Sequence, residues 1–190
     1  MPTEDLLALP FDHLPPEAES TFEGHRAFGY DLPTALADLV DNALTARARH
    51  VWLDFVWDGP ASTITATDDG GGMTEPELVT AMRLSSRNPR EERDAHDLGR
   101  FGLGLKTASL SQAQRFTVRS FKLRRKAVTR CWDLALIAAA RDWRLLKAAD
   151  AAAEPCLTRL AALSHGSAVV WQNLDRLTSG TSTNSDRDHQ

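Results

Sequence analysis

Two cysteines are all that the 190-residue sequence contains, and neither has a cysteine or histidine nearby at the spacing of a zinc site. We therefore expect Cys131 and Cys156 to be free, buried thiols rather than metal ligands. No apolar run reaches the roughly 18–20 residues that a membrane-spanning helix needs. The N-terminus is acidic and proline-containing, and it lacks the basic-then-apolar pattern of a secretion signal. These absences lead us to expect a cytoplasmic protein with no membrane partner.

Neither sign of charge dominates, because 22 lysines and arginines face 26 aspartates and glutamates, for a formal net charge of −4. The overall charge therefore gives no indication of nucleic-acid binding. The one local exception is a basic run at residues 122–126, KLRRK. It lies between two strand-like stretches, and we interpret it as a solvated turn in preference to a patch for a phosphate backbone.

The length and composition of the chain favour one domain. Hydrophobic residues make up 42% of the sequence and charged residues 25%, which is the composition of an ordinary globular protein. A chain of this size buries roughly 70% of its extended surface on folding, so it needs no metal or disulfide. The predicted organisation is an N-terminal arm at residues 1–21, one domain at residues 22–176 and a polar, disordered tail at residues 177–190.

Three helices can be placed from local patterns. Apolar residues at helical spacing predict an amphipathic helix from Pro33 to Arg47, with proline at an acceptable early position. A second helix is expected after Thr74, because Glu77 stands three residues further on, in the position of a capping box. A third, short helix is expected over residues 105–113, directly after a glycine-rich stretch.

Strand-like runs occur in two pairs. The first pair flanks an Asp-Gly-Pro turn and consists of residues 51–57 and 62–68. The second pair flanks the basic run and consists of residues 115–121 and 127–134. Each pair is rich in β-branched and aromatic residues, so each predicts an antiparallel hairpin. A final strand is expected at residues 166–174.

The order of these elements predicts an α+β fold. Hairpins with helices between them are typical of a two-layer sandwich, with a mixed, mostly antiparallel sheet and helices on one face. The regular strand–helix alternation of a doubly wound parallel sheet is absent. Residues 134–165 are rich in alanine and leucine, and an alanine-rich helix is the default there, with a strand at residues 142–146 as the alternative.

The first candidate functional pattern lies on the predicted Pro33–Arg47 helix. Asp38, Asn42 and Ala46 follow one another at intervals of four residues and therefore share one face. A carboxylate there can orient a water molecule, and the amide oxygen of Asn42 is a hard ligand suited to Mg²⁺. Taken alone, this pattern is more typical of a solvated helix face. Asp41 lies off that face, and we expect it to be solvated or structural.

The second pattern, Asp68-Asp69-Gly70-Gly71-Gly72-Met73, follows a predicted strand. Consecutive glycines let the backbone approach a ligand closely and adopt positive φ. A carboxylate at a strand end, inside an apolar pocket, accepts a hydrogen bond from an exocyclic amine and so favours adenine over bases with a carbonyl there. A glycine-rich hairpin turn with acidic ends is the alternative.

The third pattern, GRFGLGLK at residues 99–106, leads directly into a predicted helix. Glycines before a helix expose its unpaired N–H groups, and the helix dipole adds partial positive charge there. Lys106 adds a full charge, so the pattern predicts an anion site. The spacing is neither that of a P-loop nor that of a dinucleotide-binding fingerprint.

The order of the three patterns is informative. The sequence runs DLVDNALTA at residues 38–46, DDGGGM at residues 68–73 and GRFGLGLKTAS at residues 99–109. In this order they resemble the N box and two glycine boxes of the GHKL ATPases, a superfamily that includes gyrase B subunits, ninety-kilodalton heat-shock chaperones, histidine kinases and MutL. The resemblance extends from about Phe22 to Leu174. The residues LVDNALTA and FGLGLKTAS look most similar to those of MORC-type ATPases and their prokaryotic relatives.

The resemblance implies a Bergerat-type sandwich that binds ATP and Mg²⁺. Asn42 would coordinate the Mg²⁺ that bridges the phosphates, and Ala46 would belong to the same binding face. Asp68 would bind the adenine amino group. The base would be lined by the residues of the first glycine box, namely Gly70, Gly72 and Met73.

The resemblance also implies a phosphate site at the second glycine box. Its backbone N–H groups and the ammonium of Lys106 would face the phosphates, a set comprising Gly99, Gly102, Leu103, Gly104, Leu105 and Lys106. Ser167 stands where the family often has a Gly-Thr pair that supports the water network around adenine. The polar segment 85–98 matches the ATP lid of the family, and its lack of apolar side chains is consistent with easy opening.

The catalytic position departs from the family pattern. Hydrolysing members place glutamate four residues before the asparagine, where this chain has Asp38. Aspartate is one methylene shorter, and a misplacement of about 1 Å can lower a rate on the order of a hundredfold. The resemblance therefore implies slow ATP hydrolysis. ATP binding without hydrolysis, as in a sensor or assembly module, is the alternative, and phosphotransfer of the histidine-kinase type is a less favoured one.

The family pattern also implies partners. In the gyrase, MutL and chaperone groups a following domain supplies a basic residue to the γ-phosphate, and this chain ends about where that domain would begin. We therefore expect a downstream domain or a partner protein to supply that contact. An ATP-dependent homodimer that uses the N-terminal arm is expected by analogy.

Overall fold

The computed structural model describes residues 9, 12–27, 30–84 and 104–178. Residues 1–8, 10 and 11 of the predicted N-terminal arm and almost all of the predicted tail therefore lie outside the described residues. Five strands form one sheet: β1 (Val51–Val56), β2 (Thr63–Asp68), β3 (Arg115–Phe121), β4 (Val128–Asp133) and β5 (Gly166–Gln172). The α-helices are α2 (Ala18–Arg26), α3 (Leu32–Thr45), α4 (Glu75–Met82), α5 (Gly104–Gln112), α6 (Leu134–Ala140), α7 (Thr158–Ala161) and α8 (Asp175–Thr178). Two 3-10 turns complete the fold, η1 (Gly59–Ala61) and η2 (Pro155–Leu157).

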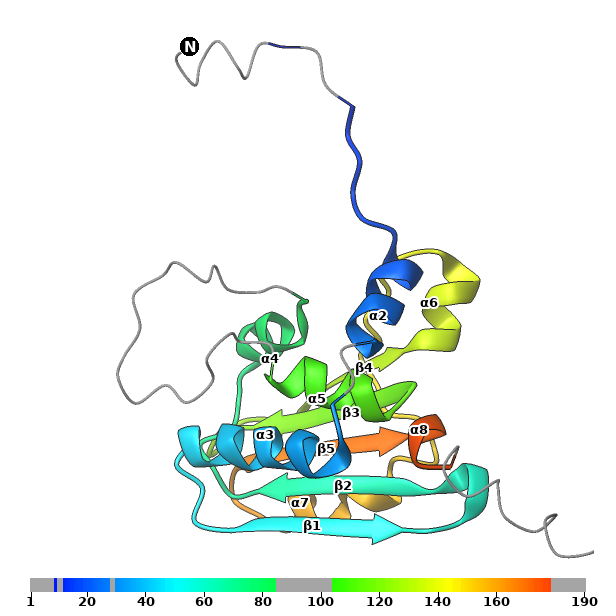
Figure 1. Cartoon of the computed structure of the whole chain (residues 1–190). Coiled ribbons are helices and arrows are strands. Elements are labelled where there is room, and N and C mark those ends of the chain that lie inside the picture. The colour runs from blue at the N-terminus through cyan, green and yellow to red at the C-terminus, as the bar shows by residue number, and fades with distance from the viewer. Residues whose placement is uncertain (1–8, 10–11, 28–29, 85–103, 179–190) are drawn as a thin grey trace, which may run out of the picture.

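The sheet is antiparallel throughout its described strands, in the order β1-β2-β5-β3-β4 (Figure 1). Both predicted hairpins, β1–β2 and β3–β4, are confirmed, and the last strand lies between them. The α+β fold class is therefore confirmed, with no parallel pair among these strands. Because β5 joins the two hairpins, residues far apart in the sequence meet at one end of the sheet.

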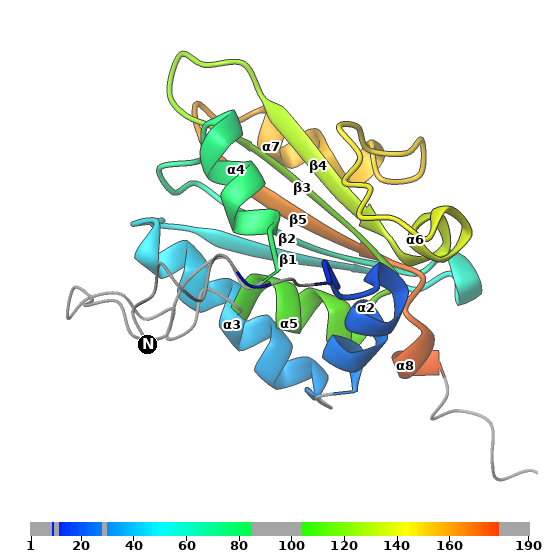
Figure 2. The same cartoon turned by 90° about the horizontal axis from the view of Figure 1, so that it is seen from above.

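The main core lies between one face of the sheet and helices α2 to α5 (Figures 1 and 2). Its largest fully buried side chains include Trp171 of β5, Phe22 of α2, Phe116 of β3 and Leu110 of α5. Burying a side chain of this size stabilises the fold by roughly 1.5–3 kcal/mol. Helices α3 and α5 pack against each other over this face.

The second face of the sheet is also covered, which the sequence analysis did not anticipate. Ala168 and Val170 of β5 pack there against Leu157 and Leu160 from η2 and α7, and α7 lies on the side of the sheet opposite α3 and α5 (Figure 2). A central strand that is apolar on both faces needs cover on both. Helices on one face alone would leave these side chains in water.

The alanine-rich stretch 134–165 is not one helix. Helix α6 ends at Arg141, whose φ of 50° lies in the left-handed region, and Leu146 then pairs with Cys131 of β4 in a single bridge. The alternative prediction, a strand at residues 142–146, is therefore met only by the single bridge at Leu146. The chain then crosses to the other face of the sheet, where η2 and α7 lie.

Local capping follows the sequence closely. Asp31 accepts a hydrogen bond from the backbone N–H of Thr34 at 2.8 Å and so caps α3, with Pro33 in the first turn. Helix α3 runs from Leu32 to Thr45 and so ends two residues before the predicted end. The capping box at Thr74 and Glu77 is confirmed at the start of α4.

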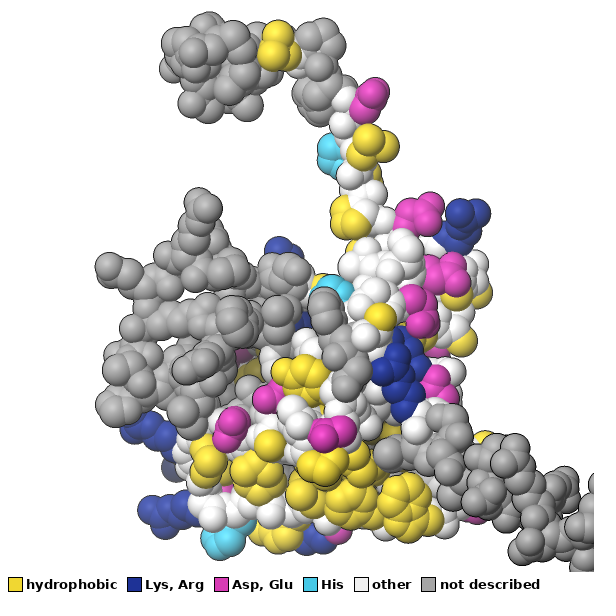
Figure 3. Space-filling model, viewed as in Figure 1, with side chains coloured by type: hydrophobic (Ala, Val, Ile, Leu, Met, Phe, Trp, Pro, Cys, Tyr) yellow, Lys and Arg dark blue, Asp and Glu magenta, His cyan; other side chains and the backbone are white. Residues whose placement is uncertain are grey.

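Strand β1 forms one edge of the sheet and carries exposed apolar side chains. Together with Leu44 of α3, the exposed side chains Leu53, Phe55 and Trp57 contribute to a hydrophobic surface over α3 and β1 (Figure 3). Asp54 in the middle of the strand bonds to Arg159 of α7. A charge within an edge strand disfavours pairing with another strand.

Arg26 is the buried charge that ties the N-terminal helix to the rest of the fold. Its guanidinium donates to the backbone carbonyls of Leu110 at 3.1 Å and Ala113 at 2.8 Å and forms an ion pair with Asp175. Only 4% of Arg26 is exposed. It therefore joins α2, the end of α5 and α8.

We predict that Arg26→Met lowers the free energy of unfolding by about 3 kcal/mol, because it removes the cationic partner of Asp175 and leaves two buried carbonyls without this donor. Urea denaturation measures the change. Arg144→Met is the matched control, since Arg144 is exposed, and its effect should stay within about 0.5 kcal/mol. Equal effects of the two substitutions would contradict the structural role given to Arg26.

Candidate functional site

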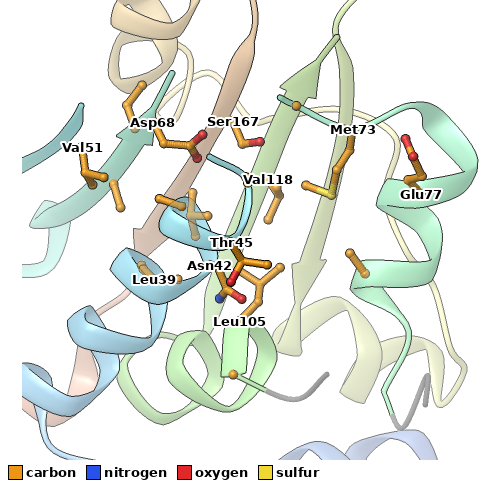
Figure 4. A pocket seen from close by; sticks show the side chains of 18 of the residues that line it. Leu39, Asn42, Thr45, Val51, Asp68, Met73, Glu77, Leu105, Val118 and Ser167 are labelled. Atoms are coloured by element: carbon orange, nitrogen blue, oxygen red, sulfur yellow. The ribbon is translucent and has the colours of Figure 1, made fainter. Parts of the chain in front are cut away.

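A cavity of about 560 Å³ opens between the sheet and helices α3, α4 and α5 (Figure 4). This volume is in the range of small-molecule and cofactor sites, which is roughly 300–1,000 Å³. Its floor consists of small and β-branched side chains of the sheet, Ala66, Val118 and Val169, and one wall comes from α4. Polar groups are few, as is usual in a ligand site.

Eight of the predicted site residues line this one cavity. They come from four separate parts of the sequence and comprise Asn42, Ala46, Asp68, Gly72, Met73, Gly104, Leu105 and Ser167. Figure 4 shows the side chains of Asp68 and Ser167 at one end and those of Asn42 and Leu105 at the other. The three sequence patterns therefore converge, as a shared ligand site requires.

The remaining predicted residues do not line the cavity or are not described. Asp38, Gly70 and Lys106 lie outside its lining. Gly99, Gly102 and Leu103 lie outside the described residues, as does the predicted lid at residues 85–98. Their predicted roles therefore remain predictions.

Asp68 is held at the end of β2 by its own turn. Its Oδ1 accepts a hydrogen bond from the backbone N–H of Gly70 at 2.8 Å. Burial raises the pKa of Asp68 to about 6, the Gly70 hydrogen bond opposes this rise, and the neighbouring charge of Asp69 adds to it. The cavity therefore contains a carboxyl group whose ionisation is disfavoured, and a hydrogen-bond donor in a ligand would stabilise its charged form.

Two glycines allow the strand ends to meet at this end of the cavity. A Cβ on Gly166, whose φ is +140°, would lie 2.1 Å from the carbonyl oxygen of Asp68. A Cβ on Gly72, whose φ is +66°, would lie 2.0 Å from the carbonyl oxygen of Phe121. Only glycine fits either contact, and together they bring β2, β5 and β3 to one point.

Ser120 positions the first glycine box and was not predicted. Its Oγ accepts from the backbone N–H of Met73 at 2.7 Å and lies 2.8 Å from Oγ of Ser167. It also donates to the carbonyl of Gly166. A buried serine on a strand carries no sequence signal of this role, because its partners are 46 and 47 residues away.

The carboxylate of Asp69 binds backbone N–H groups and does not line the cavity. It accepts from the backbone N–H groups of Arg49 and His50 at 2.7 and 2.9 Å, and from the ring of His50 at 2.7 Å. The hydrogen bonds from His50 lower the pKa of Asp69 to about 2. The two neighbouring aspartates therefore have opposite roles, since one secures the α3–β1 loop and the other faces the ligand space.

Asp38 lies beside the start of α5. A Cβ added to Gly104 would be 3.5 Å from Oδ2 of Asp38, so this carboxylate adjoins a residue that lines the cavity. Within the described part of the chain Oδ2 is buried and has no hydrogen-bond partner. Burial raises the pKa of Asp38, the charge of Asp41 adds to the rise, and the Tyr30 side chain opposes it. A buried carboxylate oxygen in this state favours a water molecule or another donor.

Lys106 is directed away from the cavity lining. It is 1% exposed, and its Nζ donates to the backbone carbonyl of Arg83, just after α4, at 2.8 Å. The bond joins α5 to the end of α4. Its predicted contact with phosphates remains a prediction.

Most of the lining residues that were not predicted lie outside the three sequence patterns. Val118 and Val169 belong to strands that come together only in the sheet, and the α4 wall comprises Pro76, Glu77, Thr80 and Ala81. Thr45 lies next to a predicted residue on α3. Alternating apolar positions in β3 and β5 predict strands but not which face borders a cavity.

Comparison with known proteins identifies the class. Residues 30–167 match the family described as "Histidine kinase-, DNA gyrase B-, and HSP90-like ATPase". This match covers well over half of the chain, and the chain therefore belongs to that ATPase family. The resemblance to the GHKL superfamily is confirmed.

Three curated proteins are similar to parts of the chain. The DNA mismatch repair protein MutL of Dictyoglomus turgidum is 28% identical over 89 residues, which cover 46% of this chain and 15% of MutL. The chaperone protein HtpG of Bacillus velezensis is 32% identical over 90 residues, 43% of this chain and 14% of HtpG. The ATPase morc-1 of Caenorhabditis elegans is 33% identical over 76 residues, 40% of this chain and 8% of morc-1. The matched segments thus span 8–15% of these relatives' lengths.

Two kinds of feature are absent from the described residues. Among them, no group of three or more histidine, cysteine, aspartate or glutamate side chains is arranged to hold a metal ion. Within the same ranges, no helix combines the length and apolarity that crossing a bilayer requires.

The raised pKa of Asp68 makes stability depend on pH. Because the folded-state pKa of about 6 exceeds the usual value of 3.8, the folded protein holds this proton between about pH 4 and pH 6. The associated stability is complete below pH 4 and is lost as the pH rises through 6. We predict that Asp68→Asn is more stable than the parent at pH 7 by about 2–3 kcal/mol, and that this advantage is absent near pH 4.

Urea denaturation of both proteins across this range measures the difference. Asp58→Asn, at an exposed turn, is the control and should show no such change with pH. A difference between Asp68→Asn and the parent that stays constant from pH 4 to pH 7 would rule out the burial of Asp68 as its cause.

Proposed function

We propose that this chain is a Mg²⁺-dependent ATP-binding domain with slow ATP hydrolysis. The observation that carries the proposal is that Asp68, Asn42 and the first residues of α5 line a single cavity. These groups supply an acceptor for an amine, a hard oxygen ligand and a helix N-terminus. Adenine, a phosphate-bound cation and the phosphates require these three chemistries.

The end of the cavity at Asp68 suits adenine. Its carboxylate would accept from the exocyclic amine, and the flat apolar floor of Ala66, Val118 and Val169 would contact the ring. A base with a carbonyl at that position would face a buried carboxylate without a donor, which is unfavourable by about 1–3 kcal/mol or more. The Ser120–Ser167 pair would support the solvent around the base.

The opposite end suits the phosphates. Asn42 would hold Mg²⁺ through its amide oxygen, and because the described residues offer no cluster of carboxylates, the nucleotide oxygens and water would complete the coordination. Gly104 and Leu105 begin α5 and line the cavity, so their backbone N–H groups lie at a helix N-terminus that favours anions.

Hydrolysis would depend on Asp38. Its unpartnered Oδ2 adjoins Gly104 and is available to orient a water molecule near the phosphate end. Its shorter side chain supports slow turnover. Binding without hydrolysis is the competing proposal, and the same unpartnered oxygen favours hydrolysis over it. The downstream contact to the γ-phosphate, the ATP-dependent dimer and the lid remain predictions.

We predict that ATP with Mg²⁺ raises the midpoint of thermal unfolding and that Asp68→Leu abolishes the shift, because ligand binding to the folded state stabilises it. At a concentration one hundred times the dissociation constant, the stabilisation should reach about 2.7 kcal/mol. Differential scanning fluorimetry with ATP, ADP and GTP measures the shifts. Asp58→Leu, at the exposed η1 turn, should retain the full response, and a GTP shift equal to that of ATP would exclude Asp68 as the base selector.

A second prediction concerns hydrolysis. Asp38→Asn should reduce phosphate release at least about tenfold, because an amide cannot serve as the general base, whereas Asp38→Glu should preserve or raise it. Both variants should bind ATP, which separates turnover from binding. Asp58→Asn, at the exposed turn after β1, serves as control. Phosphate release that is unaffected by all three substitutions would leave ATP binding as the function.

A further inference from the structure

One end of the sheet gathers positive charge. The registers align Val51, Asp68, Ser167, Ser120 and Val128 in one row across the five strands. The α3–β1 loop and the β3–β4 turn both lie just beyond this row. Together they carry six cations, which we call the basic end: Arg47, Arg49, Lys122, Arg124, Arg125 and Lys126. Figure 3 shows Lys and Arg side chains projecting at this end of the sheet.

Three of the carboxylates near the basic end already have basic side-chain partners. Glu77 accepts from Lys122 at 2.7 Å, and this contact, with the Thr74 hydrogen bonds, lowers the pKa of Glu77 to about 2. Glu75 is paired with Arg130, and Asp69 with His50. These acidic side chains are therefore not available to neutralise the other cations.

Five of the six cations are exposed, and none of the five forms an ion pair with another described residue: Arg47, Arg49, Arg124, Arg125 and Lys126. The sixth, Lys122, anchors the turn to α4 through Glu77. The turn is further closed by a backbone bond from Arg125 to Lys122 at 2.9 Å. The structure therefore presents the turn's cations on a fixed support.

At the opposite end of the same sheet the charges are largely paired. Asp133, which ends β4, pairs with Arg115, and Asp175, which follows β5, pairs with Arg26. The formal net charge of −4 therefore does not describe the basic end, where five exposed cations lack such partners among the described residues. A polyanion approaching the molecule would be directed towards the basic end.

The spacing of the cations limits the kind of polyanion. Strands β1 and β4 are the two edges of a five-stranded sheet, so the two basic loops are separated by four strand spacings, roughly 19 Å. A single phosphate group cannot reach both loops. A stiff duplex, with one charge per roughly 1.7 Å of its axis, can span them without paying the ordering entropy of a flexible chain.

We propose that the basic end binds the phosphate backbone of a nucleic-acid duplex, so the turn at residues 122–126, interpreted from the sequence as a solvated turn, becomes a phosphate contact. The contact requires no nucleotide in the cavity, so it is independent of the proposed ATP binding. It reads no sequence, because loops of lysine and arginine contact phosphates rather than base edges.

The test is fluorescence anisotropy of a labelled 20-base-pair DNA duplex, and of the matching RNA duplex, titrated with the whole chain in the absence of ATP. Binding should weaken with salt, with a slope of roughly 0.9 for each phosphate contact. The turn variant R124Q/R125Q/K126Q should weaken binding at 50 mM salt by at least about tenfold and lower the slope by about 2–3. The loop variant R47Q/R49Q should lower the slope by about 2.

The matched control is R141Q/R144Q/K147Q, which removes three exposed cations from the segment after α6. It should leave binding within about threefold of the parent. Absence of salt-dependent binding to both duplexes, or an equal loss in this control, would overturn the proposal. Displacement of the duplex by an equal charge of polyglutamate would also overturn it, in favour of an acidic protein partner. Unchanged melting of each variant verifies its fold.

Discussion

The site depends on a close approach of backbones at one end of the sheet. Gly166 lies so near the carbonyl of Asp68 that no side chain fits, and Gly72 lies as near to that of Phe121. These contacts allow β5 to pair along β2 and β3 up to their last residues. Without them Asp68, Ser167 and Met73 would not border one cavity. The geometry of the site therefore depends on the absence of a side chain at these two glycines.

Local chemistry could be predicted from the sequence, and long-range placement could not. The Thr74–Glu77 capping box and both hairpins depend on residues a few positions apart, and they were predicted with boundaries within a few residues. The lining by Val118 and Val169 and the role of Ser120 depend on β5 entering between two hairpins. No local pattern encodes that insertion. The break of α6 at Arg141 escaped prediction because alanine and leucine favour helix whatever the tertiary context.

The neighbouring aspartates illustrate how environment separates chemically identical groups. Asp69 receives two backbone hydrogen bonds and one from His50, which keep it ionised, whereas Asp68 is buried and receives fewer donors. The motif DDGGG alone does not distinguish the two aspartates. Their positions relative to the strand do, because Asp68 is the last residue of β2 and Asp69 lies beyond it.

The bond from Lys106 to the carbonyl of Arg83 has a consequence for the rigidity of the cavity. It joins the residue just after α4 to the first turn of α5. Because α4 forms one wall of the cavity and the first residues of α5 line it, the bond connects two sides of the cavity directly. The relative position of these two sides is thus fixed by a buried side chain that lies outside the cavity lining.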